Sequence, residues 1–381
     1  MTGFWQLPAP ATFLRRVVED LREGNNVVVA IPNHAPSGWP TALRSSLADP
    51  VLPRLKEIQT DGSAPIPTLH KELALGPCSP RATIADLCAN AGFQSRLLHI
   101  QRFTPPAWQA WSAFLCEYED ACRHLGLAQR TLFIATIQGD LAAQSPQPAN
   151  LLRVHHWLDC VDSLNIRLHA AGLLSATTLP HWHRQLAVAL LAELALWDPD
   201  VLTAGAALPL ADIMEPEPWL SQIALTRGWS PSDDPSLPEA AWQGLRQNFE
   251  NRRRTHSAWL ALAGRREALD LRVWNGQVSA LFPLLEQHRR GLLSTHSRLL
   301  RVPWSTQYGS TINNLEDLEL NHIADQLRIQ NSRGLSDLCT FVNWLRDVRN
   351  DLAHLTPVEP NRLLDPRFQS RMGTIPTHED D

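Results

Sequence analysis

The chain has 381 residues, of which 44% are hydrophobic, and its formal net charge is −5 at pH 7. This composition excludes general disorder, leaves room for two domains with their own cores, and argues against nonspecific coating of nucleic acid, because an acidic balance repels phosphate unless basic groups gather locally. The six cysteines have no metal-ligand spacing, no secretory signal opens the chain, and no apolar run reaches the roughly 18 to 20 residues of a membrane span. We therefore expect a cytoplasmic protein with no membrane contact, no metal and no cofactor.

The first part of the chain predicts the order helix, strand, loop, helix. Apolar residues recur at helical spacing over residues 13–21, and residues 27–31 form a continuous apolar run that is typical of a buried parallel strand. We therefore predict an α/β domain in which a parallel sheet is flanked by helices. Later segments extend the pattern, with strands at 131–137 and 151–154 and helices through Leu47, at 108–125 and at 159–174.

The loop at residues 32–41, after the first strand, lies where a P-loop would lie. A phosphate cradle needs glycines for close backbone approach and a lysine after the last glycine, but here Gly38 is followed by Trp39. Neither of the chain's two lysines lies in this loop, and Asp140, beyond the 131–137 strand, is a candidate for a metal-directing acid. We expect no nucleotide binding and no ATPase activity.

This order of elements resembles the ATPase core of signal-transducing (STAND) and AAA-type NTPases, with the nucleotide motifs degraded. The resemblance depends on the order of the elements and not on motifs. Any open α/β sheet with helices on both faces is the alternative.

The middle of the chain contains two histidine clusters and an arginine run. The clusters, His155-His156 and His181-Trp182-His183, lack the i, i+4 spacing and neighbouring acids of a metal site, so we expect surface histidines. The run Arg252-Arg253-Arg254 falls in a helix predicted from Glu239 to about Ala268. A solvated helix face is the expected role of this run, and a phosphate-contacting ridge is the alternative.

Turn-forming residues mark the predicted domain boundary. Residues 229–238 are rich in Ser, Asp and Pro and predict an exposed linker. It would separate an α/β domain, residues 1–228, from a helical domain, residues 239–362. The tail at 363–381 shows no apolar period and ends in acidic residues, so we expect it to be mobile.

The helix predicted at residues 335–355 presents two chemically different faces. At about 100° per residue, one face is an apolar stripe that should pack in a core. The opposite face suits RNA cleavage without metal, because a neutral imidazole can take the proton of a ribose 2′-hydroxyl while a guanidinium holds the phosphate. The alternative is that Arg349 pairs with Asp347 or Glu286 and that His354 offsets the helix dipole. The apolar stripe contains Leu345, Val348, Leu352 and Leu355, and the polar face Arg349, Arg346, Asn350, Asn343 and His354.

The pattern Arg349-Asn350-x-x-x-His354 resembles the signature of HEPN domains, on the last long helix of a small helical bundle. Residues 273–290 resemble the long first helix of such a bundle, and residues 315–327 and 335–355 its later helices. The resemblance implies an endoribonuclease, a toxin or an effector of prokaryotic antiviral defence that binds RNA and is a homodimer through this domain. It implies Arg349 and His354 as catalytic residues, with Asn350 in the polar second position. We therefore predict a catalytic set of Arg349, Asn350 and His354, with Arg346, Asn343, Asp347 and Glu286 as supporting residues.

Three functions remain open from the sequence. The first is a HEPN-type, metal-independent endoribonuclease or effector subunit that the N-terminal domain regulates or recruits. The second is a nonenzymatic scaffold or dimerisation subunit of a multi-protein defence complex. The third is a ligand-sensing, CARF-like domain that controls a HEPN ribonuclease, although such sensors usually begin with a strand and this chain begins with a helix.

Overall fold

The computed structural model describes residues 3–60, 62, 64–306, 309–330 and 335–374. The chain forms two compact units that interleave along the sequence, whereas the domain boundaries predicted from the sequence divide it into contiguous segments. Those boundaries stay a prediction. The first unit takes Met1–His169, Trp197–Asp200 and Ser232–His256, and the second takes Ala170–Leu196, Val201–Pro231 and Ser257–Asp381.

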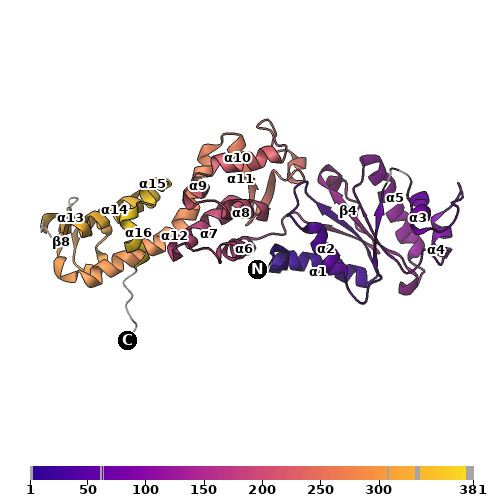
Figure 1. Cartoon of the computed structure of the whole chain (residues 1–381), viewed down its shortest axis with the longest axis horizontal. Coiled ribbons are helices and arrows are strands. Elements are labelled where there is room, and N and C mark those ends of the chain that lie inside the picture. The colour runs from indigo at the N-terminus through magenta and orange to yellow at the C-terminus, as the bar shows by residue number, and fades with distance from the viewer. Residues whose placement is uncertain (1–2, 61, 63, 307–308, 331–334, 375–381) are drawn as a thin grey trace. The chain divides into compact units, whose positions relative to one another are not determined.

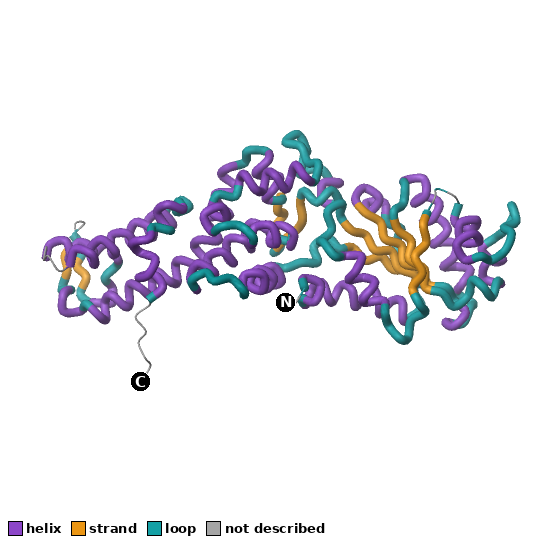
Figure 2. Tube along the Cα trace, viewed as in Figure 1, coloured by secondary structure: helices purple, strands orange, loops and turns teal. Residues whose placement is uncertain are grey.

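The first unit is built on a five-stranded parallel sheet in the order β2-β3-β4-β1-β5, which Figure 2 shows in orange. Parallel strands need a crossover between them, and the helices of these crossovers cover both faces. Figure 1 shows α1 and α2 on one side of the sheet and α3, α4 and α5 on the other. The strands are β1 (Asn26–Ile31), β2 (Leu55–Gln59), β3 (Leu97–Gln101), β4 (Leu132–Gln138) and β5 (Leu152–His156), and the helices are α1 (Pro8–Arg22), α2 (Trp39–Leu47), α3 (Pro65–Leu73), α4 (Ile84–Ala89) and α5 (Pro105–Cys122).

The apolar run that predicted the first strand forms β1, an inner strand of the sheet between β4 and the edge strand β5. Every residue of β1 is buried, and β1 pairs with β4 on one side and β5 on the other. Helix α1 begins at Pro8, buries its apolar stripe and ends before Gly24, whose φ is 84°. The prediction of a parallel sheet flanked by helices is therefore confirmed.

Two of the five strands were not predicted. Strand β2 lies at the sheet edge, where only Ile58 is fully buried, so its sequence lacks a continuous apolar run. Strand β3 is buried but contains His99, whose imidazole hydrogen-bonds the Thr136 hydroxyl of β4 at 2.9 Å. Both strands carry polar residues that obscure the hydrophobic pattern.

The predicted helix from Glu239 to about Ala268 is wrong. Residues 238–262 instead form a 3-10 turn, the antiparallel hairpin β6 (Arg246–Phe249) and β7 (Arg252–Thr255), and helix α11 (Ser257–Leu262). Glu250 and Asn251 have positive φ angles of 52° and 60°, as the two central residues of a type I′ hairpin turn require. The turn lacks the Asn-Gly signature that would have predicted it. The arginine run therefore lies on a strand.

The second unit is mainly helical. Its longest helix, α12, packs on α7 where Gly276 meets the backbone of Leu190, because a Cβ added there would lie 2.8 Å from the Leu190 Cα. Among the described residues, no helix has the length and apolar character that a membrane span requires. Its helices are α7 (His181–Ala195), α9 (Leu210–Met214), α10 (Glu217–Thr226), α12 (Arg266–Thr295), α13 (Leu320–Gln330), α14 (Ser336–Ala353), α15 (Pro360–Leu363) and α16 (Pro366–Gly373), with α11 and the short pair β8 (Trp304–Ser305) and β9 (Thr311–Ile312), while α6 (Ser163–Leu174) and α8 (Pro199–Ala206) each contain residues of both units.

The segment predicted to be a mobile tail, residues 363–381, contains the helix α16. In α16, Phe368 and Met372 are buried, and the Phe368 ring stacks on Trp344 of α14 at 4.9 Å between centroids. The Met372 carbonyl lies 3.4 Å from Nε2 of the buried His288. No pattern in the sequence indicated α16, because an eight-residue helix with only two buried apolar side chains is too short to show a period, and the mobility of the tail stays a prediction. Residues 375–381 lie outside the described residues.

Candidate functional site

Helix α14 carries the predicted catalytic motif and is anchored on its apolar face. Leu345, Val348 and Leu352 are fully buried, as the helical spacing predicted, and Val342 is buried with them. Two indole N–H groups connect α14 to its neighbours, and at the end of the helix Trp274 of α12 donates to the Leu352 carbonyl at 2.7 Å. In the same way, the Trp344 indole donates to the Arg362 carbonyl at 2.9 Å.

The helix ends at the predicted histidine. The backbone N–H of His354 donates to the carbonyls of Asn350 and Asp351, and Leu355 has a φ of 60°, which breaks the helical path. The His354 side chain is exposed, and those of Arg349 and Asn350 are half-buried. Exposed Leu355 does not join the apolar face, so that part of the predicted stripe is wrong.

Arg349 has a different acidic neighbour from those predicted. Its Nη2 lies 3.9 Å from Oε2 of Glu319, the residue before α13, and the two side chains are 43% and 55% exposed. Ion pairs this exposed and this long contribute about 0 to 1 kcal/mol. Most of the guanidinium's hydrogen-bonding capacity therefore stays available to a ligand. The helical periodicity of residues 335–355 gave no signal for Glu319, because the contact joins α14 to a residue outside that helix.

The predicted supporting residues have local partners. Arg346 pairs with Asp347 at 2.9 Å, and the Asn343 amide donates to the Cys339 carbonyl at 2.9 Å. Glu286 accepts two hydrogen bonds from Arg289, at 2.7 and 2.8 Å, and one from Arg290.

The Glu286–Arg289 pair has a structural role that its contacts explain. The hydrogen bond from Arg289 lowers the pKa of Glu286, and the same bond raises that of Arg289. Arg289 also donates to the carbonyls of Glu316 and Leu318, and so connects α12 to the segment before α13. The structure thus groups Arg349, Asn350 and His354 at one end of α14 and places Glu286 in a separate interaction.

The turn after β1 has the form of strand, loop and helix that a phosphate cradle uses, and Gly38 has the positive φ of 82° at the start of α2. Its backbone donors have partners within the first unit. The Asn33 N–H donates to the Trp242 carbonyl at 2.8 Å, and the Ser37 N–H lies 3.2 Å from both carboxylate oxygens of Asp200. The chain's own carboxylate thus lies against an N–H that a phosphate would need.

Trp39 occupies the position of the missing lysine. It is 5% exposed and packs against Trp5 and Phe13, with ring centroids 5.4 and 6.0 Å away. Asp140, the candidate metal-directing acid, is exposed in a 3-10 turn after β4. In this loop, aromatic side chains pack around Trp39, and the N–H groups of Asn33 and Ser37 donate within the protein.

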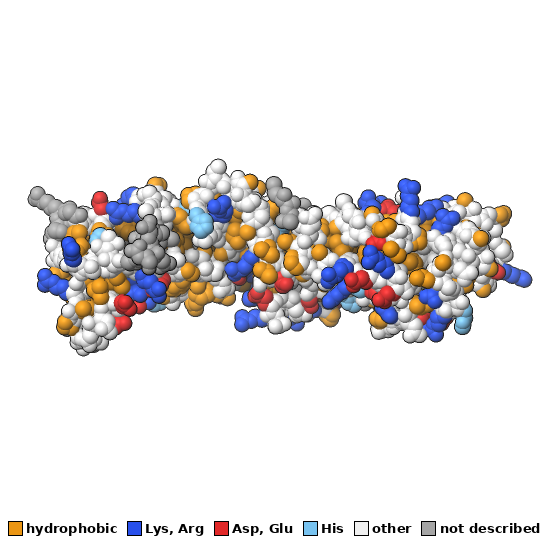
Figure 3. Space-filling view, turned by 90° about the horizontal axis from the view of Figure 1, so that it is seen from below, with side chains coloured by type: hydrophobic (Ala, Val, Ile, Leu, Met, Phe, Trp, Pro, Cys, Tyr) orange, Lys and Arg blue, Asp and Glu red, His pale blue; other side chains and the backbone are white. Residues whose placement is uncertain are grey.

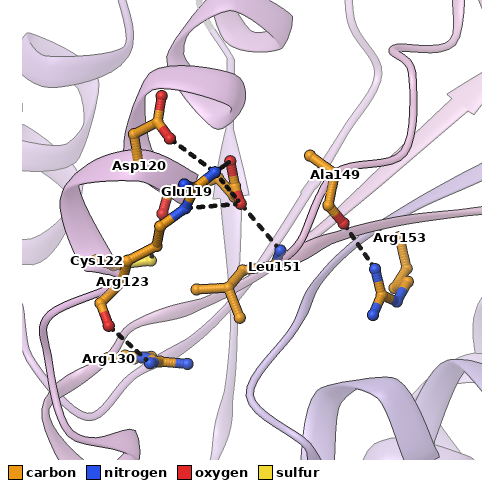
Figure 4. Close-up of polar contacts among 8 residues, drawn as sticks. All are labelled: Glu119, Asp120, Cys122, Arg123, Arg130, Ala149, Leu151 and Arg153. Atoms are coloured by element: carbon orange, nitrogen blue, oxygen red, sulfur yellow. Dashed lines mark hydrogen bonds and ion pairs between the residues drawn. The ribbon is translucent and has the colours of Figure 1, made fainter.

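A buried carboxylate lies at the other end of the sheet (Figure 4). Glu119 of α5, with a side chain 4% exposed, accepts two hydrogen bonds from Arg123 through Oε1, and Oε1 also accepts one from the Leu151 N–H at 3.1 Å. It therefore joins α5 to the start of β5. Because its hydrogen bonds are all made within the protein, we interpret it as a structural group.

The remaining sequence candidates are dispersed. His155 lies 2.5 Å from an Asp20 carboxylate oxygen, and His183 contacts Gln369 at 2.5 Å, whereas His181 is exposed. In the hairpin, Arg253 donates to the Ser236 carbonyl at 2.6 Å. Within the described residues, no group of three or more His, Cys, Asp or Glu side chains is arranged to hold a metal ion.

Comparison with known proteins gives no assignment. No family model matches the chain, and no curated protein matches it.

Proposed function

We propose that this protein is a HEPN-type, metal-independent endoribonuclease or effector subunit of an antiviral defence system, and that its α/β unit regulates or recruits this activity. The observation that carries the proposal is the end of α14, where Arg349, Asn350 and His354 are accessible while the opposite face is buried. The guanidinium would hold a phosphate and stabilise its developing charge, and the imidazole would take the 2′-hydroxyl proton.

Two copies of the helix are needed in this proposal. Five residues along a helix separate Arg349 from His354 by about 7.5 Å of rise and about 140° of rotation, so the two side chains diverge. A homodimer that faces two α14 helices would bring the arginine of one copy near the histidine of the other. On the face drawn in Figure 3, basic and acidic side chains lie interspersed, which favours local contacts with phosphate over a broad electrostatic surface.

The test is cleavage of labelled single-stranded RNA by the purified full-length chain in the presence of a chelator, with the oligomeric state measured on the same samples. We expect His354→Ala to abolish cleavage and Arg349→Lys to reduce it strongly, because lysine keeps the charge and loses the bidentate geometry. His181→Ala is the matched control, since His181 is also an exposed histidine of the second unit. Cleavage that survives His354→Ala would refute the proposal.

Glu319 offers a second test of the same site. A phosphate that binds Arg349 must compete with the Glu319 carboxylate, so Glu319→Gln should raise cleavage. The increase should stay below about fivefold, because an exposed ion pair contributes at most about 1 kcal/mol. A large loss of activity would instead give Glu319 a catalytic role and contradict this interpretation.

A nonenzymatic scaffold is the second candidate. It is favoured by the turn after β1, where Trp39 replaces the lysine and internal contacts occupy the Asn33 and Ser37 donors. On this view the chain forms a stable complex with a separate catalytic protein. That complex would survive Arg349→Lys and His354→Ala, and no RNA would be cleaved by the chain alone.

A further inference from the structure

An apolar pocket of about 350 Å³ lies at the amino-terminal ends of the parallel strands, within the first unit. Its walls come from the end of α1 and from the segments that lead into β2, β3 and β4. Its volume falls at the lower end of the range of ligand pockets, roughly 300 to 1,000 Å³. The lining residues are Leu21, Arg22, Val51, Leu52, Pro53, Ser95, Leu127, Ala128, Arg130 and Leu132.

Two large apolar side chains of this pocket are open to solvent. Val51 is 72% exposed and Leu127 is 53% exposed, whereas Leu21 and Leu132 on the inner wall are buried. Exposed apolar surface that continues into a concave apolar wall is typical of a binding site, since a ligand can cover both at once.

The pocket also contains two guanidinium groups. Arg22 pairs with Asp49, whereas Arg130 forms no ion pair with any carboxylate of the described residues. Arg130 is held in place by its hydrogen bonds to the carbonyls of Leu125, at 2.9 Å, and Arg123, at 3.3 Å. No described residue accepts a hydrogen bond from its Nη1.

This nitrogen and the apolar Leu127 side chain both lie over Gly24. A Cβ added to Gly24 would lie 2.5 Å from Leu127 Cδ1 and 3.4 Å from Arg130 Nη1, so both atoms cover the same glycine. An apolar contact and a cationic donor are thus adjacent. A ligand that meets both must combine an apolar body with a negatively charged group.

We infer that this pocket binds a small amphipathic carboxylate, with its linear apolar chain against Leu127 and Val51 and its carboxylate on Arg130. The carboxylate matches the guanidinium as a charge-assisted hydrogen-bond acceptor, and the chain removes the exposed apolar surface from water. This site lies at the opposite ends of the strands from the turn after β1, and it does not depend on the proposed function.

The test is calorimetric titration of the full-length protein with sodium decanoate below the concentration at which it forms micelles, alongside decan-1-ol and sodium butyrate. We expect saturable binding of decanoate at one site. The alcohol should bind about tenfold more weakly, because a hydrogen bond to a charged group contributes more than a neutral one. Each buried methylene that is removed should weaken binding by up to about fourfold, so butyrate should not bind measurably.

Two variants and a control locate the site. Arg130→Met should weaken decanoate binding about tenfold, by loss of the charged hydrogen bond. Val51→Asp places a negative charge at the exposed rim, where folding is least affected, and should also weaken binding. Arg96→Met is the matched control, because exposed Arg96 likewise donates to a backbone carbonyl, that of Gly92, and does not line the pocket.

Four results would overturn the inference. They are the absence of saturable decanoate binding, equal affinity for decanol, unchanged affinity in both Arg130→Met and Val51→Asp, and binding of a peptide with a C-terminal leucine in place of decanoate. The last result would assign the pocket to a polypeptide terminus. Circular dichroism of each variant confirms that the fold is retained.

Discussion

Acid should destabilise the first unit through one buried histidine. His99 on β3 is 2% exposed, its Nε2 contacts the Thr136 hydroxyl, and its Nδ1 is buried without a hydrogen-bond partner among the described residues. Burial lowers the pKa of His99 from 6.5 to about 4, because the charged imidazolium loses its hydration. We predict that the first unit becomes less stable as the pH is lowered, and that replacing His99 removes much of this pH dependence.

The direction and the magnitude of this change in stability follow from the linkage between proton binding and folding. The folded pKa lies below the unfolded pKa, so the unfolded chain binds the proton first as pH falls. The contribution of His99 is complete above about pH 6.5 and is lost as pH falls toward about 4. Between pH 7.5 and pH 5 this loss is about 2 kcal/mol, a large fraction of a typical stability of about 5 to 15 kcal/mol.

Hydrogen exchange of peptides from β3 and β4, corrected for the pH dependence of the intrinsic exchange rates, measures the free energy of opening in this unit alone. The comparison variant is His99→Gln, whose amide does not titrate and can still bond the Thr136 hydroxyl. Other histidines with lowered pKa values, including His156 and His169, affect both proteins alike. Equal pH dependence in the two proteins would refute the reasoning.

Further predictions concern packing, a buried charge and the turn after β1. Gly276→Ala should destabilise the second unit by about 1 to 3 kcal/mol, because its Cβ meets the Leu190 backbone, whereas Gly172→Ala, with open space, should be neutral or stabilising in thermal unfolding. Glu119→Ala should cost about 2 to 3 kcal/mol in denaturant unfolding, since it leaves the Leu151 N–H without its acceptor; a cost below 1 kcal/mol would argue against this role. MgATP at about 1 mM should leave the melting temperature unchanged, because a ligand stabilises only the state that it binds, and a saturable rise would contradict our interpretation of the turn.

Elements with a strong hydrophobic period could be predicted from the amino-acid sequence alone. The apolar run of β1 and the two-faced pattern of α14 depend on local spacing, and both are as predicted except at Leu355, which is exposed beyond the end of α14. The loss of the P-loop lysine was equally readable, because the chemistry of that loop depends on residue type at one position. The candidate residues Arg349, Asn350 and His354 were likewise found from sequence, and their activity stays a prediction.

Strands and contacts whose partners are distant in the sequence could not be predicted, because only folding brings those partners together. Strand β2 exists because it adds to the edge of β3, and the β6–β7 hairpin exists because Glu250 and Asn251 adopt positive φ angles without the usual glycine. The pairing of Arg349 with Glu319 and the contact of Ser37 with Asp200 join segments far apart in the chain. Such contacts leave no periodic trace, because each is a single pairing between residues whose spacing the fold alone sets.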